Sequence, residues 1–396
     1  MSGNPNWLCC QIGAREHYAI PRALERLGAL KRLFTDFWFP SNAWPGFRDK
    51  ERFHDGLANS IVTASNVGSM RFELTAKVRG YSGWELIHAK NGSFQQFVLA
   101  KLKNSYTNGN GQPHTVFAYS YAAEGIFEFA RQRGWKTVLG QIDAGPLEEQ
   151  LLCALNENKG SGWTPAPPEY WQQWRRECDL ADHIVVNSEW SREALVNQGI
   201  SADKIKIIPL ALEPTAESAT FIPSYPREFT SHRPLRVLFL GQICLRKGVD
   251  ALLQAIQLLD DEPIEFLFVG PIQVEIPDAL RSESRVQWVG TVPRSQTSDY
   301  YRKADVFILP TLSDGFGLTQ LEAQAWKLPV IASRFCGSVV EDGINGLLLP
   351  EVSSSAIVNA LTTILRSPKK LQAMSDASHV SERFSLASIG ASLVNL

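Results

Sequence analysis

Short apolar runs alternate with amphipathic helical patterns along the first half of the chain. The helical patterns cover residues 17–27, 122–133 and 189–198. The apolar runs around them have the length of buried strands, and they cover residues 7–10, 116–120, 137–142, 183–187 and 205–210. Runs of this length between helices are typical of βαβ units. We therefore expect a mostly parallel sheet with helices on both faces.

The second half of the chain repeats this pattern. Helical patterns include residues 249–259 and 296–303. Strands are expected at residues 235–240, 265–269, 286–289, 306–309 and 330–332. The chain is thus predicted to be an α/β protein with two doubly wound, Rossmann-like parallel-sheet domains. Two such domains imply a cleft between them.

A change of composition separates the two halves. Residues 213–234 carry four prolines among serines and threonines. This composition predicts a linker without a regular helix or strand. We therefore expect an N-terminal domain at 1–212, a C-terminal domain at 235–380 and an amphipathic tail at 381–396.

Length and charge exclude some classes of protein. A chain of 396 residues is longer than one ordinary domain and long enough for two cores. The formal net charge is −2, and no run of Lys and Arg is present. Nucleic acid is therefore not expected as a partner. The six cysteines form neither a C-x-x-C pair nor a His-paired metal pattern, so they are expected to be buried thiols in a reducing compartment.

The apolar segments also bear on the membrane. No stretch is long enough to cross a bilayer. The first apolar run, at 7–12, has no charged segment before it, so we interpret it as a strand and not as a signal peptide. A cytoplasmic protein is expected. Residues 71–103 mix basic and aromatic side chains, which predicts either a solvated helix face, the slightly favoured alternative, or peripheral contact with a membrane surface.

The most informative segment is residues 313–333. It sets two carboxylates, Asp314 and Glu322, at opposite ends of a glycine-rich turn. A helix is expected to follow over 318–327, ended by Pro329. Glu322 would lie in the second turn of this helix, about 6–7 Å along its axis. Asp314 would stay in the loop on the other side.

The start of this helix is suited to an anion. The free N–H groups near Gly317 and Leu318 and the positive end of the helix dipole face the loop. A diphosphate bound there would leave Glu322 beside a ribose diol and Asp314 beside a sugar. The segment therefore predicts a site for a nucleotide-diphosphate sugar.

A second loop supplies cations. The strand at 235–240 ends at Gly241, a loop with Arg246 and Lys247 follows, and Gly248 starts the next helix. Ligand sites of parallel sheets lie at the carboxyl ends of the strands. We therefore expect Arg246 and Lys247 to face the same edge of the cleft and to contact the diphosphate.

The segment from Asp314 to Ala323 resembles the signature of the retaining GT-B glycosyltransferases of family 4, also called glycosyl transferases group 1. That signature is an acid, seven residues and a Glu, and here an Asp stands in the first acidic place. The loop at Gly241, Lys247 and Gly248 is similar to the family pattern G-R-x-x-x-x-K-G, although Gln242 replaces its Arg. The segments 181–191, 205–210 and 341–348 also resemble family turns and strands.

The resemblance implies a fold and an activity. The fold would be GT-B, with the segment 381–396 crossing back onto the first domain. The protein would be a hexosyltransferase that retains anomeric configuration and takes its sugar from a nucleotide sugar. A UDP-sugar is favoured over a GDP-sugar as the donor. No cofactor or metal is expected, because no D-x-D motif lies in a suitable loop and residues 260–262 are interpreted as a solvated turn. Arg246, Lys247 and the amides near Gly317 would stabilise the departing diphosphate instead.

The acceptor side is less defined by the sequence. The His that the family often carries after its strand at 115–120 is replaced here by Tyr119-Ser120-Tyr121, so no catalytic residue is assigned. Arg15 and His17 follow the first strand and are candidate cleft residues. The acceptor would be a saccharide or a lipid. Two alternatives stay open: a GT-B enzyme that epimerises or hydrolyses the sugar nucleotide, and a non-catalytic subunit that only binds it.

Overall fold

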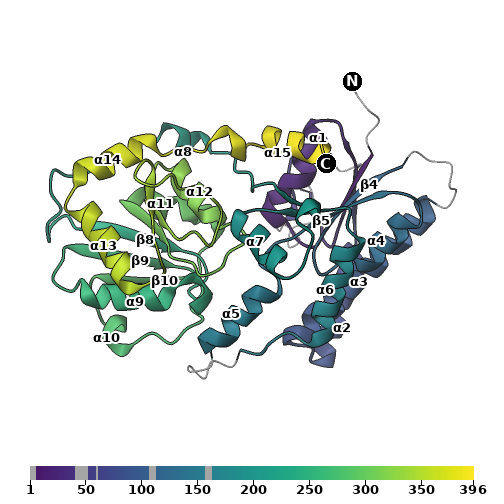
Figure 1. The fold of residues 1–396 in the computed structure, drawn as a ribbon, viewed down its shortest axis with the longest axis horizontal. Coiled ribbons are helices and arrows are strands. Elements are labelled where there is room, and N and C mark those ends of the chain that lie inside the picture. Colours follow the sequence, from purple (N-terminus) through teal and green to yellow (C-terminus); the bar gives the residue numbers. More distant parts are fainter. Residues whose placement is uncertain (1–5, 41–51, 59–60, 107–112, 157–162) are drawn as a thin grey trace.

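The protein consists of two parallel sheets, each covered by helices on both faces (Figure 1). The computed structural model describes residues 6–40, 52–58, 61–106, 113–156 and 163–396. Within these residues, every pair of registered strands is parallel. The predicted fold class, two Rossmann-like parallel-sheet domains, is confirmed.

The first sheet has the strand order β3-β2-β1-β4-β5-β6-β7. Its strands are β1 (Trp7–Gln11), β2 (Leu30–Thr35), β3 (Val62–Ala64), β4 (Thr115–Tyr119), β5 (Lys136–Gly140), β6 (His183–Val186) and β7 (Ile205–Ile207). Its helices are α1 (Ala19–Arg26), α2 (Asn66–Arg79), α3 (Gly83–Ser105), α4 (Glu124–Arg131), α5 (Pro146–Asn156), α6 (Pro168–Leu180) and α7 (Glu189–Asn197). Both α5 and α7 lie on the side of this domain that faces the second sheet (Figure 1).

The second sheet has the order β10-β9-β8-β11-β12-β13. Its strands are β8 (Leu235–Leu240), β9 (Ile264–Val269), β10 (Val286–Gly290), β11 (Val306–Leu309), β12 (Val330–Ala332) and β13 (Gly346–Leu348). The helices that follow the linker are α9 (Val249–Leu258), α10 (Asp278–Arg281), α11 (Thr297–Lys303), α12 (Leu318–Ala325), α13 (Ser354–Leu365), α14 (Pro368–Ala377) and α15 (Leu386–Val394).

Each sheet has a hydrophobic core on both faces, because successive side chains of a strand point to opposite sides. In β1, Leu8 and Cys10 belong to one buried cluster, while Trp7 and Cys9 belong to another. Most of the strands are therefore largely apolar runs, which is why the sequence predicts them.

Three strands were not predicted, and each has a physical reason. Strand β2 carries the exposed Lys31 and the half-buried Arg32, which interrupt its apolar run. Strands β3 and β13 are three residues long and lie at sheet edges, so they have almost no pattern of their own.

Four other predictions need correction. The helix expected at 17–27 begins at Ala19, because the three residues before it have left-handed backbone angles. The helix expected at 318–327 ends at Ala325, and Lys327 is left-handed with φ of 54°. The linker is not free of regular structure, since α8 (Ala216–Thr220) forms between its prolines. The cysteines are not all buried: Cys153 and Cys244 are partly exposed.

The C-terminal segment returns to the first domain. Helix α15 packs against α1, where Leu386, Ile389 and Leu393 are buried in the same cluster as the apolar side chains of α1. A Cβ on Gly390 would lie 3.0 Å from the carbonyl oxygen of Ala23, so the glycine permits this close approach. The two helices lie side by side in Figure 1.

The residues of the predicted membrane surface lie on α2 and α3. In the part of the chain that the structure describes, no helix is both long and apolar enough to span a bilayer. Helix α2 exposes Val67, Leu74 and Val78, of which Val78 is 87% exposed. Contact of this surface with a membrane stays a prediction.

Candidate functional site

The loop before α12 is built on glycines for steric reasons. Gly317 caps the helix with a left-handed φ of 75°, and a Cβ on it would lie 2.7 Å from Leu309 Cδ2. The neighbouring Phe316 is buried and meets the ring of Phe384 edge-on. The N–H of Asp314 donates to the carbonyl of Phe335 at 2.9 Å. The turn is therefore fixed from both sides, and the first N–H groups of α12 have no acceptor within the helix itself.

A cavity of about 380 Å³ lies at this helix start, between the two domains. The first domain contributes Arg15, Glu16, Ile142, Asn187 and Leu210 to its wall, and the second contributes Leu240, Gly241, Gln242, Arg246, Lys247, Asp314, Phe316, Gly317, Leu318 and Thr319. Five of the six predicted donor residues thus line one cavity. The sixth, Glu322, does not line it.

Lys247 and Asp314 form an ion pair inside this cavity, with side chains only 13% and 15% exposed. Burial by itself raises the pKa of the Asp314 carboxyl, but the charges of Lys247 and Arg246 outweigh burial and hold that pKa below its ordinary value. The amide of Phe316 also donates to Asp314 at 3.4 Å. Asp314 is therefore ionised, and its charge balances that of Lys247.

Arg246 belongs to a polar network that crosses the cleft. Its Nη1 donates to the carbonyl of Ser313 at 2.6 Å, and its Nε lies 3.4 Å from Oε1 of Glu148 on α5. The hydroxyl of Ser313 donates to Glu148 at 2.8 Å and accepts from the indole N–H of Trp190 on α7 at 3.1 Å. Burial raises the pKa of Glu148 to about 7 in spite of the Arg246 charge. Through Glu148, the first domain thus contacts the loop of the second domain that carries Arg246 and Lys247.

Glu322 lines a neighbouring cavity of about 600 Å³. One of its carboxylate oxygens lies 3.2 Å from Nη2 of Arg294, and the other accepts from the hydroxyl of Tyr301 at 2.8 Å. These contacts fix the rotamer of Glu322 and leave 18% of its side chain exposed. The two acids of the motif therefore face two adjoining cavities, as two ends of a long ligand would require.

Residues 234–367 match the family model described as glycosyl transferases group 1. This match covers the second of the two sheets, from just before β8 to just after α13. Among curated relatives, the D-inositol 3-phosphate glycosyltransferase of Xylanimonas cellulosilytica is 31% identical over 208 residues, which cover 47% of this chain and 49% of the relative. The amylovoran biosynthesis glycosyltransferase AmsK of Erwinia amylovora is 26% identical over 193 residues, covering 45% and 46%. The matches thus span about half the length of these relatives.

Solved structures of similar fold cover nearly the whole chain. Sucrose-phosphate synthase from Thermosynechococcus elongatus has a TM-score of 0.66 and 17% identity, covering 98% of this chain and 97% of that one. Anabaena HepE in complex with UDP-glucose has a TM-score of 0.63 and 14% identity, covering 98% of both chains. At such identities the likeness shows the fold, which is the predicted GT-B arrangement.

The sequence analysis overlooked two residues of these cavities, Glu16 and Arg294. Glu16 lines both the 380 Å³ and the 600 Å³ cavity and accepts from the hydroxyl of Tyr119 at 3.2 Å. Burial raises the pKa of Glu16 to about 7. Its side chain reaches the cleft because Glu16, His17 and Tyr18 all have left-handed φ angles, of 51°, 52° and 59°. Residues with strained backbone angles of this kind are often found at functional sites. No sequence pattern predicts these angles.

The two residues that the sequence did propose in this loop also face cavities. Arg15 lines the smaller cavity, and its guanidinium lies 5.4 Å from the ring centre of Tyr119. His17 lines the larger one. Burial, assisted by the charge of Arg294, lowers the pKa of His17 to about 4. The imidazole of His17 is therefore neutral at pH 7 and is not a proton donor there.

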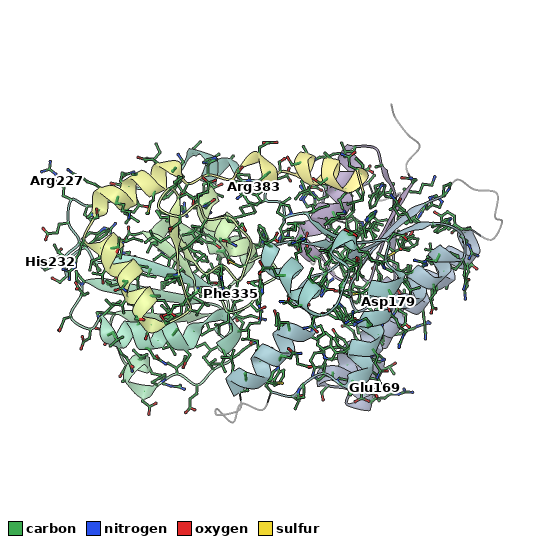
Figure 2. All side chains as sticks on the ribbon, viewed as in Figure 1. Glu169, Asp179, Arg227, His232, Phe335 and Arg383 are labelled. Atoms are coloured by element: carbon green, nitrogen blue, oxygen red, sulfur yellow. The ribbon has the colours of Figure 1, made fainter. Side chains whose placement is uncertain are left out.

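The backbones of the two domains come close together at Gly315. A Cβ on Gly315 would lie 2.1 Å from the carbonyl oxygen of Ile142, at the end of the β5 segment. Beside this contact, the hydroxyl of Ser191 lies 3.5 Å from the carbonyl of Gly315, and the rings of Trp190 and Phe335 meet edge-on at 4.9 Å. Figure 2 shows Phe335 at the junction of the two domains. The absence of a side chain on Gly315 thus allows the backbones of the two domains to pack directly against each other.

Replacing Gly315 by alanine should force this junction apart. The clash is with backbone, which cannot turn away, and the φ of Gly315 is not left-handed, so the effect is steric alone. We expect a larger radius of gyration in small-angle scattering, and nucleotide turnover at least about tenfold lower because a 1 Å misplacement has such effects. Gly92→Ala on α3 is the matched control, since its Cβ meets nothing within 4 Å. Unchanged scattering and turnover in Gly315→Ala would show that the junction is not rigid.

Proposed function

We propose that this protein transfers a sugar from a nucleotide-diphosphate sugar to a hydroxyl group of an acceptor, with retention of anomeric configuration and without a metal ion. A UDP-sugar is favoured over a GDP-sugar as donor. The observation that carries the proposal is the arrangement of Lys247, Asp314 and the α12 N-terminus around one cavity, with Glu322 in the cavity beside it.

The proposed donor spans the two cavities. The diphosphate contacts Lys247, Arg246 and the amides of Gly317 and Leu318, which all line the smaller cavity. The ribose hydroxyls bind Glu322, whose carboxylate is already oriented by Arg294 and Tyr301. The arriving diphosphate competes with Asp314 for Lys247. Asp314 is then free to accept hydrogen bonds from the hydroxyls of the sugar.

The same groups stabilise the transition state. When the bond between the sugar and the diphosphate breaks, negative charge grows on the diphosphate oxygens. Cations and N–H groups fixed at that point bind the transition state more strongly than the ground state. Their positions are set before the donor arrives, because Arg246 is tied to the Ser313 carbonyl and Glu148. Little reorganisation remains to be done during the reaction.

The relatives support the choice of donor. HepE is described in complex with UDP, with UDP and glucose, and with UDP-glucose. Curated relatives are described as glycosyltransferases acting on D-inositol 3-phosphate or in amylovoran biosynthesis. These descriptions favour transfer over the two alternatives, a sugar-nucleotide epimerase or hydrolase and a non-catalytic binding subunit.

Nucleotide release separates the three functions. The full chain is incubated with UDP-, GDP- and ADP-sugars, with and without acceptors, in buffer containing EDTA. We expect UDP release that depends on an acceptor and is unchanged by EDTA, and NMR of the product should show the anomeric configuration of the donor. Altered sugar without acceptor would support the epimerase or hydrolase. Binding without release under all conditions would support the non-catalytic subunit and overturn the proposal.

A further inference from the structure

A third and larger hollow of about 920 Å³ opens beside the diphosphate cavity. We call it the α5 groove. One wall comes from the first domain, with Leu152 and Asn156 of α5 and the nearby Trp163. The other wall comes from the second domain, from the segments that follow β8 and β9. Its volume is in the range of pockets that enclose a ligand of several rings.

The α5 groove joins the diphosphate cavity directly. Gln242 and Arg246 line both hollows. On the far side, the diphosphate cavity joins the Glu322 cavity through Glu16, which lines both of those. The three hollows therefore follow one another in the cleft. If the nucleoside occupies the Glu322 cavity and the diphosphate the middle one, the α5 groove is the approach left for the acceptor.

The walls of the α5 groove mix apolar and hydrogen-bonding side chains. Trp163, Leu152 and Leu253 offer flat or aliphatic surface, and Gln242 and Gln273 are exposed amides that can both donate and accept. A sugar ring has the matching character, with apolar faces and a rim of hydroxyls. A lipid chain would instead need a continuous apolar wall, which these amides interrupt.

The charges of the α5 groove are mainly negative. Among the residues that the structure describes, Glu275 and Asp278 line it, and the lining cation Arg246 lies 3.4 Å from the carboxylate of Glu148. Arg281, which lies 3.7 Å from Asp278 in an exposed pair, offsets one carboxylate only in part. Approach of a phosphorylated acceptor would bring like charges together, which suppresses binding.

We propose that the acceptor is an uncharged saccharide of two or more sugar units, bound in the α5 groove with one ring on Trp163. This inference rests on the proposed transfer function and specifies its acceptor. In the reaction, an acceptor hydroxyl oxygen forms a bond to the anomeric carbon of the donor sugar. The bond from that carbon to the diphosphate oxygen breaks, the diphosphate leaves with the electron pair, and it takes up the hydroxyl proton.

The test uses the full chain with the UDP-sugar that it binds most tightly. The acceptor probes are the neutral trisaccharides maltotriose, cellotriose and mannotriose, and the anionic probe is myo-inositol 3-phosphate. We expect at least one trisaccharide to raise UDP release and to give a tetrasaccharide in mass spectrometry, and no stimulation by the inositol phosphate. Trp163→Ala should raise the KM for the active trisaccharide by about tenfold, the value of one lost stacking contact, with the Kd for UDP unchanged.

A variant with fewer carboxylates in the α5 groove tests whether negative charge there suppresses binding of a phosphorylated acceptor. The double variant Glu275→Gln, Asp278→Asn should gain turnover with myo-inositol 3-phosphate. The matched control, Glu169→Gln, Asp179→Asn, removes the same charge from the exposed surface of the first domain and should gain none; Figure 2 shows both residues in the first domain.

Three results would overturn the inference: strong turnover of the inositol phosphate by the unaltered protein, no response to any trisaccharide, or an unchanged trisaccharide KM in Trp163→Ala. In each case, UDP binding would be measured for the unaltered protein and for variants of the donor-binding residues. Binding by the unaltered protein that is lost in those variants would show that the proposed donor site still holds. Absence of UDP-sugar binding altogether would contradict the proposed function itself.

Discussion

Replacing Lys247 by methionine is expected to lower kcat for sugar transfer by about 10²–10³-fold, the effect of removing one group that stabilises developing charge. Lys247 is the cation nearest to Asp314, and its ammonium lines the cavity at the α12 N-terminus. Methionine keeps most of the volume of the lysine stem, so the change removes charge more than packing. The measurement is steady-state UDP release at saturating donor and acceptor.

Two further variants separate charge from folding in this experiment. Lys247→Met leaves the carboxylate of Asp314 buried without its lysine partner, which itself destabilises a protein. The double variant Lys247→Met, Asp314→Asn removes that penalty and should recover thermal stability but not turnover. Lys206→Met, at an exposed position of β7, is the control. Recovery of turnover in the double variant would mean that Lys247 serves only to neutralise Asp314.

Replacing Glu322 by alanine is expected to raise the Kd for UDP by at least about tenfold, because a hydrogen bond to a charged group is worth ~1.5–3 kcal/mol. The carboxylate of Glu322 is positioned for the ribose by Arg294 and Tyr301. Titration calorimetry measures the affinity directly. Tyr301→Phe removes one of these orienting contacts and should have a smaller effect.

A ligand without the ribose diol makes the Glu322 test specific. If Glu322 binds the diol, 2′,3′-dideoxy-UDP should bind the unaltered protein weakly, and Glu322→Ala should bind both nucleotides with similar affinity. The two losses would then not add, as expected for partners in one contact. Additive losses would show that Glu322 acts elsewhere, and the ribose assignment would be wrong.

The two predictions depend on different elements of the same motif. Asp314 and Lys247 come from loops after β11 and β8, which are neighbours in the sheet. Because parallel strands end at the same edge, these loops were expected to meet, and the structure brings them into contact. Glu322 lies one turn into α12 and lines a separate cavity. The roles of these residues are proposals that the experiments above decide.

The sequence by itself determined the fold class, most of the strands and the edge of the second sheet where ligands would bind. It could do so because buried parallel strands are continuous apolar runs, and because a glycine turn before a helix has few structural alternatives. It also identified the loop with Arg15 and His17 as part of the cleft. Local patterns of this kind need no knowledge of distant residues.

The tertiary structure decided what these elements face. The left-handed turn that brings Glu16 into the cleft, the Glu148 carboxylate that holds Arg246, and the contact of Gly315 with Ile142 all join segments far apart in sequence. The α5 groove likewise exists only where α5 meets the loops of the second domain. Such features depend on the packing of two domains against each other, and no local propensity encodes that packing. They are also the features that a proposed acceptor must fit.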